Sequence, residues 1–238
     1  MRTIQLGATG LQVPVIALGC MRIGGMEQVR LEHYLKKCLE LGVNFFDHAD
    51  IYGGGECETL FSKALPLTPS VREQMILQSK CAIRSGEMYD FSKEYIVKSV
   101  DGILKRLQTE YLDILLLHRP DALMEPEEVA KAFDLLEQSG KVRYFGVSNH
   151  KPSQIELLKT CVKQELLINQ LQLSLPFSGM IASGMEVNML SPGSFDHDGS
   201  VLDYCRIKNI TVQAWSPFAT DNWGGVVIGQ ERYAEVSQ

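Results

Sequence analysis

The 238-residue sequence has no apolar stretch that approaches the roughly 20 residues needed to span a bilayer. It also has no excess of basic residues, because 29 acidic residues outweigh 23 basic ones and give a formal charge of −6. Nucleic acids and anionic membranes bind basic surfaces, so neither is an expected partner. The first residues, 1–7, carry no secretory apolar core. The 45% hydrophobic content is enough for a sizeable core.

Cysteine is present but lacks a framework pattern. The six cysteines show no Cys-x-x-Cys spacing, and they occur in helix-like and strand-like segments alike. A disulfide scaffold or a metal-binding motif would place them at closer, repeated intervals. We therefore expect reduced thiols in a cytoplasmic protein.

The sequence also lacks internal repeats and low-complexity linkers, which predicts a single domain over residues 1–238. Residues 3–14 are predicted to form an N-terminal hairpin around a Gly-Ala-Thr-Gly turn. After it, short apolar runs alternate seven times with helical spacing. The strands are predicted at 15–20, 44–47, 75–80, 112–118, 141–149, 166–173 and 210–216, and the helices at 27–41, 56–65, 92–107, 126–139, 152–163 and 201–208. A long loop is expected over 175–200, where Gly, Ser and Met are frequent.

Strand–helix alternation with strands that are apolar on both sides predicts an α/β fold with a parallel sheet covered by helices. A doubly wound sheet usually carries a Gly-x-Gly-x-x-Gly turn after its first strand. Residues 18–25 read Leu-Gly-Cys-Met-Arg-Ile-Gly-Gly and do not match that turn. The sequence therefore favours a (β/α)8 barrel of the TIM type, with seven of its strands visible.

Four polar side chains stand where predicted strands end: Asp47 and, after a short loop, Tyr52, then Lys80 and His118. The carboxyl ends of barrel strands are where catalytic groups collect. Taken singly, each has an ordinary structural interpretation, as a loop cap, a packing aromatic, a solvated charge or a core histidine. Found together at successive strand ends, they indicate a catalytic site.

The same residues carry a family resemblance. The order Asp47, Tyr52, Lys80, His118 resembles the catalytic tetrad of the aldo-keto reductases, which are NADPH-dependent (β/α)8 barrel enzymes. Residues 46–53 resemble the family's Asp-x-Ala-x-x-Tyr-Gly signature. Three further segments match in order and spacing: 117–120 (Leu-His-Arg-Pro), 146–149 (Gly-Val-Ser-Asn) and 214–217 (Ala-Trp-Ser-Pro). Within the family, the chain looks most like the bacterial oxidoreductases.

This resemblance implies that the protein reduces an aldehyde or a ketone to the alcohol. Tyr52 would donate the proton, although a phenol is a poor acid at its usual pKa of about 10. A neighbouring ammonium favours the phenolate, and Lys80 can supply it while Asp47 keeps Lys80 charged. His118 can donate a hydrogen bond to the carbonyl oxygen and orient the substrate.

The resemblance also implies a cofactor site. Ser148, Asn149 and Gln170 would bind the nicotinamide carboxamide, and Trp215 would take the place of the aromatic residue that stacks on the ring. The remaining cofactor-binding residues would be Gly19, Cys20, Met21 and Arg22 near the nicotinamide ribose, and Ser216, Pro217 and Phe218 near the pyrophosphate. NADPH is the implied cofactor, but NADH stays an alternative because no residue here matches the family's basic 2′-phosphate site.

The sequence departs from the family at its C-terminal end. Nothing after residue 218 matches the eighth strand, the closing helices or their cofactor-binding loop. Residues 225–229 follow the seventh strand too closely for a crossover helix, so we expect a loop there and the start of a helix over 231–238. An open barrel edge invites an oligomer or a partner to cover it. The alternative function is therefore a nicotinamide-binding regulatory or scaffold subunit with little catalysis.

His48 and Asp50 lie beside Asp47 and could suggest a metal site. No second ligand cluster supports one, so we predict no metal and interpret both as solvated neighbours. The physiological substrate, a small carbonyl compound, would be selected by loops such as 175–200, whose shape the sequence does not give.

Overall fold

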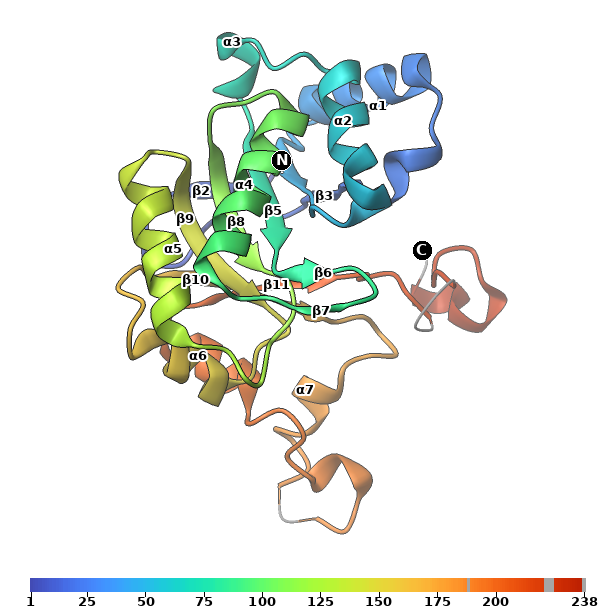
Figure 1. The fold of residues 1–238 in the computed structure, drawn as a ribbon. Coiled ribbons are helices and arrows are strands. Elements are labelled where there is room, and N and C mark those ends of the chain that lie inside the picture. The colour runs from blue at the N-terminus through green and yellow to red at the C-terminus, as the bar shows by residue number, and fades with distance from the viewer. Residues whose placement is uncertain (188, 221–224, 237–238) are drawn as a thin grey trace.

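The computed structural model describes residues 1–187, 189–220 and 225–236 (Figure 1). Within these residues, seven strands form one parallel sheet. In sheet order they are β3 (Leu18–Gly19), β4 (Phe45–Asp47), β5 (Ile76–Cys81), β8 (Leu112–Leu117), β9 (Val142–Ser148), β10 (Leu166–Gln172) and β11 (Thr211–Trp215). The order follows the chain without the reversal that defines a doubly wound sheet. The predicted barrel-type α/β fold is therefore confirmed, as an incomplete barrel.

The sheet is strongly curved. The Gln78 side chain on β5 donates a hydrogen bond of 2.8 Å to the Gln213 side chain on β11, although β8, β9 and β10 lie between those strands. A contact across three intervening strands requires the sheet to fold round on itself. The inward-facing residues of opposite strands therefore meet in a common lumen.

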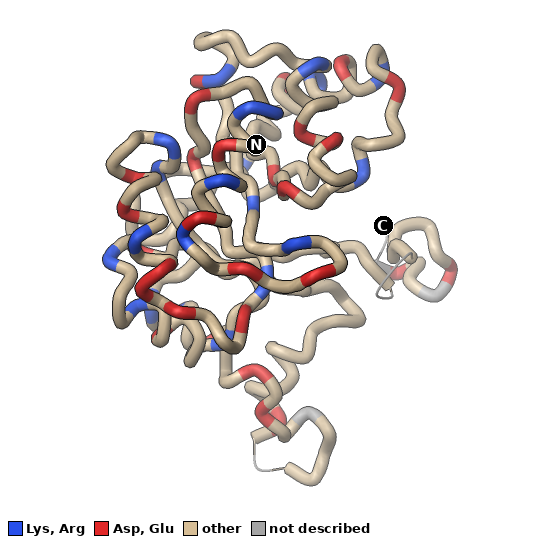
Figure 2. The backbone as a smooth tube through the Cα atoms, in the orientation of Figure 1, with Lys and Arg blue, Asp and Glu red and all other residues tan. Residues whose placement is uncertain are grey.

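Helices return the chain from each strand to the next along the outer face. They are α1 (Gln28–Glu40), α2 (Glu56–Ala64), α4 (Lys93–Leu107), α5 (Pro126–Gln138), α6 (Pro152–Lys159) and α8 (Val201–Ile207). Ser92 caps the start of α4, because its hydroxyl accepts a hydrogen bond from the Tyr95 backbone N–H. Buried residues from these helices pack on Phe46, Leu77 and Phe145 of the sheet. Figure 2 shows Lys and Arg interspersed with Asp and Glu over the surrounding helices.

The N-terminal hairpin closes the amino-terminal end of the lumen. Strands β1 (Thr3–Gln5) and β2 (Gln12–Pro14) pair antiparallel, as predicted. Leu6 and Val13 from this hairpin pack against inward-facing residues of the sheet, which are Phe45, Ile76, Ile114, Leu116, Leu167 and Ile168. This apolar cluster fills the lower lumen, so that the polar site lies at the opposite, carboxyl end.

Several elements differ from the sequence prediction. The first sheet strand is only two residues long, since Val15 and Ile16 are 43% and 53% exposed and lead toward it along the surface. The structure also contains elements that the sequence did not predict, which are the short helix α3 (Pro69–Arg72) and the hairpin of β6 (Ile83–Arg84) and β7 (Met88–Tyr89). Two-residue strands and four-residue helices are too short to produce a recognisable period.

Two segments extend away from the sheet in Figure 1. One is the predicted loop over 175–200, which contains α7 (Gly179–Ala182) and the 3-10 turn η3 (Pro192–Ser194). The other follows β11, where Ala219 and Val226 form an isolated bridge and residues 225–229 form no sheet strand, as expected. The helix expected from residue 231 is the 3-10 helix η4 (Glu231–Val236), and residues 237–238 lie outside the described part. In the described residues, each helix is too short or too polar to cross a bilayer.

Candidate active site

Asp47 and Lys80 form a buried ion pair at the carboxyl ends of two neighbouring strands. Asp47 ends β4 and faces the lumen, and Lys80 occupies the last inward position of β5. The Lys80 Nζ lies 2.8 Å from both carboxylate oxygens of Asp47 and 2.8 Å from the carbonyl oxygen of His48. Burial lowers the pKa of Lys80, but Asp47 and Tyr52 outweigh burial, so the pKa stays above its usual value. Lys80 is therefore charged although its side chain is 0% exposed.

Tyr52 completes this cluster from the loop that follows β4. The three glycines after it, at 53–55, adopt positive φ angles that only glycine takes up readily, and they turn the chain into α2. This turn holds the phenolic oxygen 3.1 Å from Lys80 Nζ. Burial raises the pKa of Tyr52 above 10, while the Lys80 ammonium opposes that rise. The phenol is therefore protonated at neutral pH and has a cation beside it to stabilise the phenolate.

His118 follows β8 and contacts the ring of Tyr52. Its ring meets that of Tyr52 edge-on, with the centroids 5.9 Å apart. Burial, with Lys80 and Arg119 nearby, lowers the pKa of His118 to about 3. Its Nδ1 is buried and has no hydrogen-bond partner among the described residues. His118 is thus a neutral imidazole, which can donate one N–H to a ligand.

The structure corrects the prediction that His48 and Asp50 are solvated. His48 is 0% exposed and packs edge-on against Phe61 at 4.7 Å, and burial lowers its pKa to about 3. Asp50 is mostly buried near Glu58 and Arg106, and burial together with the Glu58 carboxylate raises its pKa to about 7. His48 packs on a residue of α2 and Asp50 lies near Arg106 of α4, so both side chains are on the helix-covered side of the sheet. The described residues include no group of three or more His, Cys, Asp or Glu side chains placed to hold a metal ion.

The residues expected to bind the carboxamide lie next to one another. The Ser148 hydroxyl donates to the Gln170 carbonyl oxygen at 3.0 Å, and the Asn149 amide donates to that hydroxyl at 2.8 Å. Asn149 has a φ of 63°, which turns the chain sharply at the end of β9. The Trp215 indole donates to the Asn149 side-chain oxygen at 2.9 Å. A hydroxyl, two amides and an aromatic ring are suitable groups for a nicotinamide carboxamide, so the residues present fit this cofactor.

The other expected cofactor residues follow the two edge strands of the sheet, β3 and β11. Gly19 ends β3 and pairs in register with Asp47, and residues 20–22 follow it in the 3-10 helix η1 (Cys20–Gly25). Cys20 is fully buried, backbone included, whereas Met21 is 52% exposed. Ser216, Pro217 and Phe218 follow β11, and the chain turns there because Ser216 has a φ of 50°.

Two site residues were missed from the sequence. Gln78 donates to Asp47 Oδ1 at 2.6 Å, and Gln213 accepts a hydrogen bond from Gln170 at 2.6 Å. Each lies two positions before a predicted site residue, Lys80 and Trp215, and so faces the same side of its strand. The sequence signal for both was a glutamine within a predicted buried strand, two positions before a predicted site residue.

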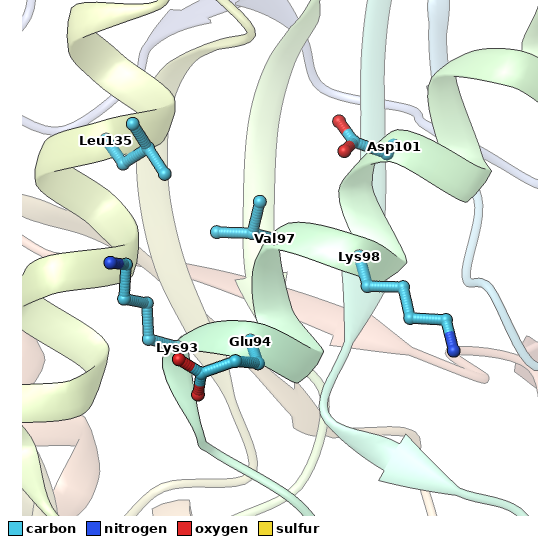
Figure 3. Close-up of a pocket in the computed structure, with 6 residues that line it drawn as sticks. All are labelled: Lys93, Glu94, Val97, Lys98, Asp101 and Leu135. Carbon is cyan, nitrogen blue, oxygen red and sulfur yellow. The ribbon is translucent and has the colours of Figure 1, made fainter.

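A shallow hollow of about 370 Å³ lies elsewhere, between α4 and α5 on the outer surface. Figure 3 shows the residues that line it, which are Lys93, Glu94, Val97, Lys98, Asp101 and Leu135. None of them belongs to a sheet strand. This hollow is therefore separate from the strand ends that carry the polar site.

Comparison with known proteins agrees with this fold. The aldo/keto reductase family model matches residues 15–223. The uncharacterized oxidoreductase YcsN of Bacillus subtilis is 42% identical over 230 residues, which cover 92% of this chain and 71% of that protein. A 6-dehydroglucose reductase of Novosphingobium aromaticivorans is 34% identical over 221 residues, which cover 90% and 67%.

Among solved structures, the thermostable aldo-keto reductase Tm1743, crystallised with the inhibitor epalrestat, superposes with a TM-score of 0.72 at 27% identity. The match covers 91% of this chain and 73% of that one. The chain is thus shorter than each of these relatives, in line with the seven-stranded, incomplete barrel that its described residues form. A family match over most of the length, together with the fold, leads to one conclusion: this chain belongs to the aldo/keto reductase family of oxidoreductases.

Proposed function

We propose that this protein reduces a small aldehyde or ketone to the corresponding alcohol, with NADPH as the reductant. The observation that carries the proposal is the position of the Lys80 ammonium. In a buried site, this single cation contacts the carboxylate of Asp47 and the phenolic oxygen of Tyr52 at 2.8 Å and 3.1 Å. Such a cluster is suited to releasing a proton from a phenol, because it stabilises the phenolate that remains.

When bound, the nicotinamide supplies the hydride for the carbonyl carbon. The protein's own residues then have separate tasks. Tyr52 donates the proton to the carbonyl oxygen, and Lys80 stabilises the resulting phenolate. His118, neutral at physiological pH, donates a hydrogen bond to the same oxygen and orients the substrate. Asp47 keeps the Lys80 ammonium charged and in place.

Ser148, Asn149 and Gln170 would bind the carboxamide, and Trp215 would lie against the ring. In the structure, the Asn149 side chain is held by Trp215 at its oxygen and by Ser148 and the His118 carbonyl at its nitrogen. The cofactor would therefore take over some of these hydrogen bonds. NADPH rather than NADH, and residues 19–22 and 216–218 as further contacts, belong to the same proposal.

The test is NADPH consumption by the purified chain with a generic aromatic aldehyde or dione, followed by the loss of cofactor absorbance. We expect saturable consumption that depends on both substrates, with NADH assayed in parallel. Absence of turnover and of NADPH binding would contradict the proposal. Binding without turnover would instead favour a nicotinamide-binding regulatory subunit, the alternative that an open barrel edge suggests.

A further inference from the structure

The lumen contains a polar layer that the proposed reaction does not use directly. On β5, alternation points Ile76, Gln78 and Lys80 into the lumen at successive heights. Ile76 belongs to the apolar cluster at the bottom, and Lys80 belongs to the ion pair at the top. Gln78 lies between them and is 0% exposed. Barrel interiors are normally filled with branched apolar side chains, so an amide at this height is unusual.

Hydrogen bonds link this amide to both halves of the proposed site. Gln78 Nε2 donates to Asp47 Oδ1 at 2.6 Å and to Gln213 Oε1 at 2.8 Å. Gln213 Oε1 also accepts from Gln170 Nε2 at 2.6 Å. One chain of hydrogen bonds therefore crosses the lumen, from Asp47 on β4 through β5 and β11 to Gln170 on β10. Burying these amides would cost free energy if they were unpaired, and these hydrogen bonds pair the NH₂ groups of Gln78 and Gln170 with acceptors, although Gln78 Oε1 itself has no partner among the described residues.

In this series of hydrogen bonds, the donor and acceptor of each bond are determined by the bond before it. An ionised Asp47 can only accept, so Gln78 must present its NH₂ group to it. The second N–H of that group then faces Gln213, which must present its carbonyl oxygen. Gln170 donates to the same oxygen, so its own Oε1 is turned away from Gln213. The carboxylate of Asp47 thereby sets which end of the Gln170 amide is available to a ligand.

We propose that Gln213 is a positioning residue that joins the proton-donating cluster to the carboxamide site. Through Gln78 it supports Asp47, and through Gln170 it presents an acceptor oxygen to the NH₂ of a nicotinamide carboxamide. The proposal rests on the proposed function, since it assigns Gln170 to the cofactor. It adds a residue that touches neither cofactor nor substrate and acts through its two neighbours.

The first test needs neither cofactor nor turnover. The side-chain amide signals of Gln78 and Gln170 can be assigned in a ¹⁵N-glutamine-labelled protein by their loss in Gln78→Met and Gln170→Met. Replacing Asp47 with Asn lets the Gln78 amide turn over, so we expect both signals to shift. In a Gln213→Met background, only the Gln78 signal should shift. Gln78→Met is a second perturbation that leaves the Lys80–Asp47 pair intact, and it should also move the Gln170 signal.

The proposal is wrong if the side-chain amide signal of Gln170 shifts in neither Asp47→Asn nor Gln78→Met. It is also wrong if Asp47→Asn shifts the Gln170 signal equally with Gln213 present or replaced, because the coupling would then take another route. Neither outcome depends on catalysis. Lack of activity in the wild-type chain would overturn the proposed function and leave the result on the hydrogen-bond chain standing.

The second test separates positioning from stability. Gln213→Met removes the shared acceptor, whereas Gln213→Glu keeps an oxygen that accepts from both amides. We expect the Met variant to bind NADPH several-fold more weakly and to lose roughly 10- to 100-fold in kcat/KM, with the KM for the carbonyl substrate little changed. The Glu variant should recover most of that loss. The thermal midpoint of the Met variant should fall, because the N–H groups of Gln78 and Gln170 lose their shared acceptor, so binding and kinetics are measured well below that midpoint. Wild-type binding and kcat/KM in the Met variant would overturn the positioning role.

Discussion

The ammonium of Lys80 lies 3.1 Å from the phenolic oxygen of Tyr52, in a site where the lysine side chain is completely buried. Burial alone would neutralise such a lysine and would leave the phenol a weak acid. Asp47 keeps Lys80 charged by pairing with it. Lys80 in turn favours the phenolate of Tyr52 and so opposes the rise in its pKa. The contact between Lys80 and Tyr52 therefore depends on a third residue at the end of β4.

Replacing Lys80 with Met should reduce NADPH-dependent carbonyl reduction by about 10²- to 10⁴-fold, because the phenolate of Tyr52 loses its cation. It should also lower the free energy of unfolding by about 3–5 kcal/mol, since Asp47 is left without its buried partner. Steady-state kinetics and urea unfolding measure the two effects. Lys98→Met, on the exposed face of α4, is the matched control and should change neither. Turnover within twofold of wild type in Lys80→Met would contradict this role.

The activity should show no inflection near pH 6.5 that belongs to His118. Because burial and nearby cations lower the pKa of His118 to about 3, its ring stays neutral from pH 5 to pH 8. His118→Gln should therefore lower kcat by a similar factor, roughly 10- to 100-fold, at every pH in that range. The measurement is kcat against pH for both proteins. A step near pH 6.5 that vanishes in the variant would show that His118 titrates in the normal range.

Asp50→Asn should stabilise the protein at alkaline pH and leave it unchanged in acid. The folded-state pKa of Asp50 is raised to about 7, mainly by burial. A raised pKa means that the folded state binds the Asp50 proton more tightly than the unfolded state does. The stability that comes from this proton is therefore present in acid and is lost as the pH rises through 7. The stability difference between variant and wild type should grow from about pH 4 to pH 7 and reach roughly 2–4 kcal/mol above it.

Urea unfolding at pH 4.5, 6 and 8 measures this difference. Asp101→Asn controls for the loss of a carboxylate on the surface. A difference of the same size at pH 4.5 and pH 8 would contradict the buried, protonated state of Asp50.

The sequence predicted the seven sheet strands because most of them are apolar runs of five or more residues that end in polar side chains. Strand β5, which carries Lys80, is an example, since all six of its residues are buried. The first strand was predicted too long because Val15 and Ile16 are apolar but exposed. Apolar character alone does not separate a buried strand from an apolar surface segment.

The position of Asp47, Tyr52 and Lys80 at one edge could be predicted, because parallel strands bring their carboxyl ends together. The environment of Asp50 could not, since its burial depends on how the loop after β4 meets α2 and on Arg106 from α4. The link from Gln78 to Gln213 depends on sheet curvature, which brings strands into contact across the lumen. Neither property is contained in a local pattern of residues.

The central claim is that Tyr52 donates the proton during carbonyl reduction. The most direct measurement compares Tyr52→Phe with wild type in two assays on the same preparation: NADPH binding, followed by quenching of tryptophan fluorescence, and turnover of an aromatic aldehyde. Tyr34→Phe, on the outer helix α1, is the control. The account predicts NADPH binding close to wild type in Tyr52→Phe, with turnover lowered at least about 100-fold. Turnover retained in Tyr52→Phe, with cofactor bound, would contradict it.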